Sequence, residues 1–234
     1  MRYKPWGNRQ EIATIHRAYR KIVKTHRTCA QETEKYFKRE PCIDERDMDD
    51  ERVGKRAIYL VFSFAPASSM ARAIIAYTEG SFSHVAIALE ESLTNMYSFT
   101  ITRGNRFSNI EGGFTYENIR DYRLQKTLIQ VNRVWVNDIQ YDRIRQQISV
   151  MAKIKNRTAY NLKGLIRYVL KEKYETEQKS MYCSEFIMHL LNGAGVEISG
   201  NGMEQISPQE LADKVKKLEG EVVYLGRAEE YGIT

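Results

Sequence analysis

Runs of apolar and β-branched residues predict most of the strands of this chain. The run AIYLVFSF, residues 57–64, is apolar at nearly every position, which is typical of a buried strand. We expect further strands at residues 81–90, 96–102, 127–136 and 221–228. The turn-forming ESLTN segment predicts a hairpin between the strands at 81–90 and 96–102, whereas the Gly- and Asn-rich residues 103–114 predict a loop.

Apolar residues at helical spacing predict the helices. We expect Asp138 to cap a helix whose buried stripe is Tyr141, Ile144, Ile148 and Met151. Ser207-Pro208-Gln209-Glu210 is a capping box with Pro at the first helical position, so another helix begins there. Further helices are predicted at residues 67–80, at residues 161–173 and from about residue 180 to 192.

The order of these elements indicates an α+β fold with a mostly antiparallel sheet packed on helices. The first part of the chain differs, because residues 12–23 predict a basic amphipathic helix that either ends there or continues through Phe37, and residues 44–52, DERDMDDER, predict an acidic linker. We therefore divide the chain into a helical basic extension with its linker, residues 1–54, and one domain, residues 55–234. The extension either packs on the domain or contacts a protein partner or an anionic membrane surface through residues 10–27.

Composition limits the classes of function. The formal net charge is +6, but the basic helix has few interleaved aromatic residues, so we do not expect nucleic acid as a partner. Neither a zinc-ligand spacing nor a phosphate-binding or dinucleotide motif is present, so we expect no metal and no cofactor. Three widely spaced cysteines form no disulfide framework, and no secretory signal or membrane-spanning run is found. These features predict a cytoplasmic protein.

Two residues have the sequence context of a nucleophile and its base. Cys183, in MYCSEF, falls in the first turn of a predicted helix, where unpaired backbone N–H groups and the helix dipole favour a thiolate. His84, in FSHVAIAL, begins a predicted strand, where an imidazole at a sheet edge can meet the tip of a helix. A lone cysteine at such a place is more often a small buried apolar residue. A catalytic pair therefore requires hydrogen-bonding reach between the two side chains.

The segments around both residues resemble those of a known superfamily. SHVAIAL resembles the Ser-His-Val-Gly-Ile block of the NlpC-type papain-like cysteine hydrolases, in which this histidine is the catalytic base. MYCSEFIMHLLNGAG resembles the Cys-Ser-Glu-Leu block of their circularly permuted, YiiX-like branch, in which the cysteine begins a helix and follows the histidine. TAYNLKGL resembles the Tyr-Asp/Asn segment of that branch. The resemblance covers roughly residues 55–228 and implies a permuted papain-like fold with Cys183 as nucleophile and His84 as base.

The resemblance also implies a third polar residue that orients the histidine from the next strand. Ser98, in MYSFTIT, matches that position best, with Thr100 on the same face and the more distant Glu117 as alternatives. Ser98 departs from the family pattern, because a serine stabilises an imidazolium less than a carboxylate does. Tyr182, directly before the nucleophile, either lines the site near the oxyanion donors or packs. We expect Glu185 to make a structural hydrogen bond rather than to act in acid–base chemistry.

The resemblance implies a cysteine peptidase or amidase that cleaves an amide or ester bond, with a peptide, amide or acyl lipid as substrate. Two other functions are compatible with the sequence. A non-catalytic binding module on the same fold is favoured by the weak third residue. A lipid acyl hydrolase or acyltransferase at a membrane surface is favoured by the basic amphipathic helix.

Overall fold

The computed structural model describes residues 54–65, 69–78, 80–105, 108–169, 179–198, 205–216 and 220–232. The predicted basic helix and acidic linker lie outside these residues, and so does the end of the helix predicted at residues 161–173.

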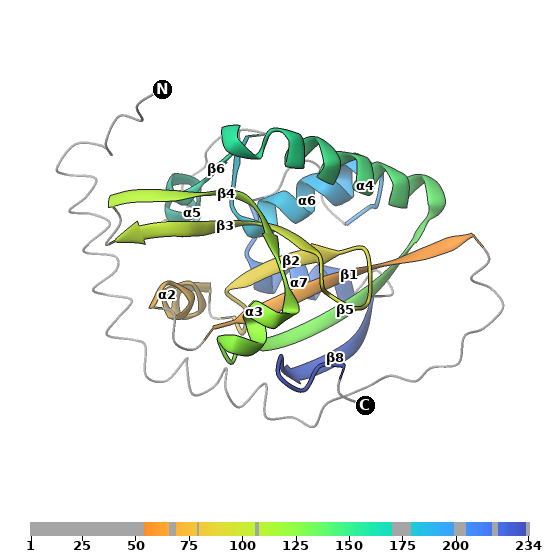
Figure 1. Cartoon of the computed structure of the whole chain (residues 1–234), viewed down its shortest axis with the longest axis horizontal. Coiled ribbons are helices and arrows are strands. Elements are labelled where there is room, and N and C mark those ends of the chain that lie inside the picture. The colour runs from red at the N-terminus through yellow and green to blue at the C-terminus, as the bar shows by residue number, and fades with distance from the viewer. Residues whose placement is uncertain are drawn as a thin grey trace.

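A six-stranded antiparallel sheet organises the domain (Figure 1). Its strand order is β4-β3-β2-β1-β5-β8. The strands are β1 (Lys55–Phe64), β2 (His84–Ala88), β3 (Met96–Asn105), β4 (Ser108–Glu117), β5 (Leu128–Asn137) and β8 (Glu221–Arg227). A separate two-stranded parallel pair joins β6 (Ala159–Tyr160) to β7 (Ser180–Met181). The prediction of an α+β protein with a mostly antiparallel sheet is confirmed.

Two buried clusters lie on the opposite faces of the sheet. On one face, alternate residues of β1, such as Leu60 and Phe62, pack with side chains of the helices α2, α4, α6 and α7. On the other face, Tyr59 and Val61 pack with the short helix α3 and the turn that follows β8. Figure 1 shows α7 behind β1 and β5 and α3 in front of them. The helices are α2 (Ser69–Thr78), α3 (Ile119–Leu124), α4 (Asp138–Lys153), α5 (Leu162–Val169), α6 (Cys183–Ala194) and α7 (Pro208–Lys216).

The two predicted helix starts have different outcomes. Ser207 and Glu210 form the expected capping box of α7, with reciprocal hydrogen bonds of 2.7 and 3.1 Å. The buried stripe of α4 is the predicted one. Its N-cap, however, is Asn137 and not Asp138, because Asn137 keeps the extended conformation of β5 and exchanges side-chain hydrogen bonds with Gln140.

The prediction of a loop at residues 103–114 is wrong, because β3 and β4 form a long hairpin there. Gly112 and Gly113 of β4 allow close packing and do not form a turn. A Cβ on Gly112 would lie 2.9 Å from Ile101 Cα and 3.0 Å from Tyr160 Cβ, and closer still to the backbone oxygen of Thr100. A Cβ on Gly113 would lie 2.5 Å from the hydroxyl of Thr158, which accepts a hydrogen bond from the Phe114 backbone. Glycine thus lets the segment that contains β6 lie directly on β4.

We expect Gly112→Ala to lower the free energy of unfolding by about 2 kcal/mol, since the added methyl group meets backbone atoms that cannot rotate away. Urea unfolding followed by circular dichroism measures the effect. Glu111→Ala, at an exposed neighbouring position of the same strand, is the control and should change stability by less than about 0.5 kcal/mol. Equal midpoints for the two variants would contradict the close packing.

Candidate active site

His84 is the first residue of β2, at the end of the strand that lies beside Ser63 of β1. Ser83 fixes this strand end, since both its backbone N–H and its hydroxyl donate to the backbone oxygen of Ser63. The side chain of His84 is 21% exposed. The imidazole therefore sits at the boundary between the core and solvent.

Glu117, the last residue of β4, contacts the imidazole. Its two carboxylate oxygens lie 3.1 and 3.2 Å from Nε2 of His84, although the two residues are 33 positions apart in the sequence. The side chain of Glu117 is 10% exposed, so little water screens the pair. This contact fixes the Nε2 atom as the proton donor to Glu117 and leaves Nδ1 for a second partner.

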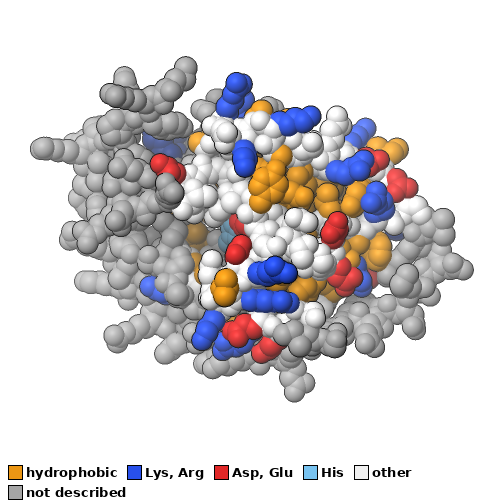
Figure 2. Space-filling view, viewed as in Figure 1, with side chains coloured by type: hydrophobic (Ala, Val, Ile, Leu, Met, Phe, Trp, Pro, Cys, Tyr) orange, Lys and Arg blue, Asp and Glu red, His pale blue; other side chains and the backbone are white. Residues whose placement is uncertain are grey.

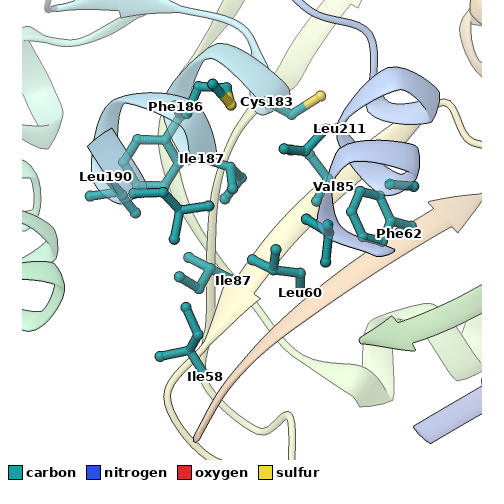
Figure 3. Close-up of a cluster of buried hydrophobic side chains, with 14 of the residues drawn as sticks. Ile58, Leu60, Phe62, Val85, Ile87, Cys183, Phe186, Ile187, Leu190 and Leu211 are labelled. Atoms are coloured by element: carbon teal, nitrogen blue, oxygen red, sulfur yellow. The ribbon is translucent and has the colours of Figure 1, made fainter. Parts of the chain in front are cut away.

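Cys183 lies near the same imidazole. It is the first residue of α6 and is buried at 3% exposure, and it lies near enough to the imidazole to act, with Glu117, to raise the pKa of His84. Figure 3 shows its sulfur at one end of the buried cluster, directed away from Phe186 and Leu190. The structure thus brings together the two residues that the sequence singled out.

The electrostatics of His84 and Glu117 are those of an ion pair. Burial acts to lower the pKa of His84, but the Glu117 carboxylate and the hydrogen bonds to Cys183 and Glu117 hold this pKa well above its ordinary value. Burial acts to raise the pKa of Glu117, but the charge of His84 and hydrogen bonds from His84 and Tyr122 hold it below its ordinary value. Each group therefore keeps the other charged, and the imidazole gains affinity for a proton.

The start of α6 is held by buried polar groups. Glu185 accepts a hydrogen bond of 2.9 Å from the backbone N–H of Tyr182, which confirms the structural hydrogen bond expected for it. Ser184 donates to the backbone oxygen of Ile206 at 2.5 Å. Tyr182 is 1% exposed, and its ring lies 6.4 Å from that of Tyr168 of α5. Tyr182 thus packs under the helix start, and the position of Cys183 is fixed from both sides along the chain.

Ser98 does not occupy the place expected of a third residue. Its buried hydroxyl donates to the backbone oxygen of Val85 at 2.8 Å, so it ties β3 to β2. Glu117, the more distant alternative, contacts His84 instead. The reason is that the strand of Ser98, β3, forms a hairpin with β4. The last residue of β4 is Glu117, and it reaches the imidazole. Tyr122, which donates to Glu117 at 2.5 Å, was not singled out by any sequence motif.

Metal binding and membrane spanning receive no support from the described part of the chain. Its residues contain no group of three or more His, Cys, Asp or Glu side chains that could hold a metal ion. None of its helices is long and apolar enough to cross a bilayer. In Figure 2, Lys and Arg side chains alternate with Asp and Glu side chains over α3 and α4, so the net positive charge is not gathered into one patch on this face.

No protein-family model, curated protein or solved structure matches this chain.

Proposed function

We propose that this protein is a cysteine hydrolase that cleaves an amide or ester bond. The observation that carries the proposal is the position of His84, whose ring hydrogen-bonds to the Glu117 carboxylate and lies near enough to Cys183 for that side chain to act on the pKa of His84. A nucleophile, a base and a group that orients the base are the three parts of a thiol-dependent acyl-transfer site. The resemblance of the flanking segments to permuted papain-like hydrolases supports the same function.

In the proposed reaction, the Cys183 thiol gives its proton to His84, and the thiolate attacks the carbonyl carbon of the substrate. The backbone N–H of Cys183, at the start of α6, supplies a hydrogen bond to the oxyanion that forms. His84 then returns the proton to the leaving amine or alcohol, and a thioester with Cys183 remains. Water, deprotonated by His84, hydrolyses the thioester and releases the acid and the free thiol.

Glu117 has the role of orienting group in this proposal. Its carboxylate fixes the ring of His84 with Nε2 turned toward β4, which directs the other nitrogen to the helix start. The carboxylate also stabilises the imidazolium that forms when the thiol loses its proton. A non-catalytic binding module was favoured because serine is a weak orienting residue. A carboxylate in this role no longer gives that reason.

The test is turnover by the purified full chain on panels of peptide, ester and acyl-lipid substrates. We expect hydrolysis of at least one class, a transient acyl adduct on Cys183 detected by mass spectrometry, and loss of both in Cys183→Ala. Saturable binding of a panel member with no adduct and no turnover would instead support a binding module on this fold.

A further inference from the structure

Tyr122 extends the hydrogen-bonded series of His84 and Glu117. It lies on the face of the sheet opposite to the one that packs on α6. Its hydroxyl donates to Oε2 of Glu117 at 2.5 Å, a short bond of the kind that a carboxylate makes with a well-placed hydroxyl. Tyr122 is 8% exposed and belongs to the buried cluster beneath α3. The side chain of Ser63, the residue that lies beside His84 across β1 and β2, is near enough to act on the pKa of Tyr122, which it lowers.

The helix that carries Tyr122 is anchored on several sides. Asn118 caps α3 by accepting from the Arg120 backbone at 2.8 Å and donates to the backbone oxygen of Thr94 at 2.6 Å. At the other end, the backbone N–H of Thr127 donates to the backbone oxygen of Tyr122 at 2.9 Å. Arg123 donates to the backbone oxygens of Ala228 and Tyr231, in the turn after β8. A six-residue helix held at this many points gives the Tyr122 hydroxyl a defined position.

We propose that Tyr122 is a positioning residue for the reaction of Cys183, because its hydroxyl holds the Glu117 carboxylate with both oxygens toward Nε2 of His84. The inference rests on the proposed function and extends it by one residue. Without that hydroxyl, the carboxylate loses a donor inside a buried site and becomes free to turn away from the ring.

The surroundings of Tyr122 keep its hydroxyl protonated, so that it can donate a hydrogen bond to Glu117. Burial, reinforced by the nearby Glu117 carboxylate, raises the pKa of Tyr122 well above its ordinary value, so its hydroxyl stays protonated. The hydrogen bond that it donates acts to lower the pKa of Glu117, as does His84. The titratable groups that act on the Glu117–Tyr122 pair from other elements are His84 of β2 and Cys183 of α6. Tyr122 is thus placed to keep Glu117 ionised.

The test is Tyr122→Phe, which removes the hydroxyl and keeps the buried ring. We expect the carboxyl carbon of Glu117, followed by ¹³C NMR, to titrate at a higher pH than in the wild type. We also expect the rate of Cys183 alkylation by iodoacetamide to fall about tenfold at low pH, the loss expected from one hydrogen bond to a charged group. A downfield hydroxyl proton should be present in the wild type and absent in Tyr122→Phe.

Tyr224→Phe is the matched control. Tyr224 is buried in the same cluster, and its hydroxyl donates to the backbone oxygen of Arg227 at 2.6 Å rather than to Glu117. It should therefore leave the Glu117 titration and the alkylation rate unchanged. Wild-type titration and wild-type alkylation in Tyr122→Phe would overturn the positioning role. If His84→Ala and Glu117→Gln also leave alkylation unchanged, the proposed function itself fails, so the two failures are distinguishable.

Discussion

Replacement of His84 with Ala is expected to lower the rate at which iodoacetamide alkylates Cys183 by about 30-fold at pH 7, since a thiol with no basic partner is only a few per cent thiolate there. In the wild type, the raised pKa of His84 favours transfer of the thiol proton to the ring. Turnover should fall further, by about 100-fold or more, because in the proposed reaction the ring also protonates the leaving group. Mass spectrometry of the alkylated peptide measures the rate at Cys183 itself.

The control for this variant is His189→Ala. His189 lies on α6 with Cys183, and burial alone lowers its pKa, with no charged partner among the causes. We expect wild-type alkylation for His189→Ala. For His84→Ala, the rate should rise steeply with pH and approach the wild-type rate in alkaline solution, where hydroxide replaces the missing base. Equal rates for His84→Ala and the wild type at pH 7 would rule out the dyad.

The second large effect is expected for Glu117→Gln, which keeps the shape of the side chain and removes its charge. The charge of the carboxylate is the largest of the effects that raise the pKa of His84 against burial, so this pKa should fall. A ring with less affinity for a proton takes it less readily from Cys183, and we expect alkylation to slow by about tenfold or more. Proton NMR of the His84 ring measures the pKa directly.

The same variant tests the contribution of the pair to stability. The pKa of His84 is raised on folding, so its stabilisation is complete below its ordinary value of 6.5 and is lost as the pH rises through the folded-state pKa. The pKa of Glu117 is lowered, so its stabilisation is present above 4.5 and is lost as the pH falls through the folded-state pKa. Urea unfolding should therefore show the largest loss for Glu117→Gln between pH 4.5 and 6.5.

Ser98→Ala separates the two candidates for the third residue. The Ser98 hydroxyl bonds to the Val85 backbone, so its loss should cost about 1 kcal/mol of stability and leave the His84 titration unchanged. If instead Ser98→Ala shifts the His84 pKa while Glu117→Gln does not, the orienting role belongs to Ser98.

Local patterns were sufficient for much of the fold. The apolar runs predicted β1, β2, β5 and β8, and periodicity predicted the buried stripe of α4, because each signal lies within one element. The hairpin of β3 and β4 was missed because glycines in a sequence indicate a turn. In the structure, Gly112 and Gly113 are glycines because Thr158 and Tyr160 lie too close to leave room for a Cβ. That approach is a long-range contact, and nothing local in the sequence encodes it.

The same division holds for the candidate site. The sequence by itself placed Cys183 at the start of a helix and His84 at the start of a strand, since both positions follow from local pattern and the resemblance. Only the tertiary structure decided that Glu117, and not Ser98, contacts the imidazole and that Tyr122 holds Glu117. The physical reason is that these contacts depend on how far the β3–β4 hairpin extends and where α3 docks, and both are set by packing between distant segments.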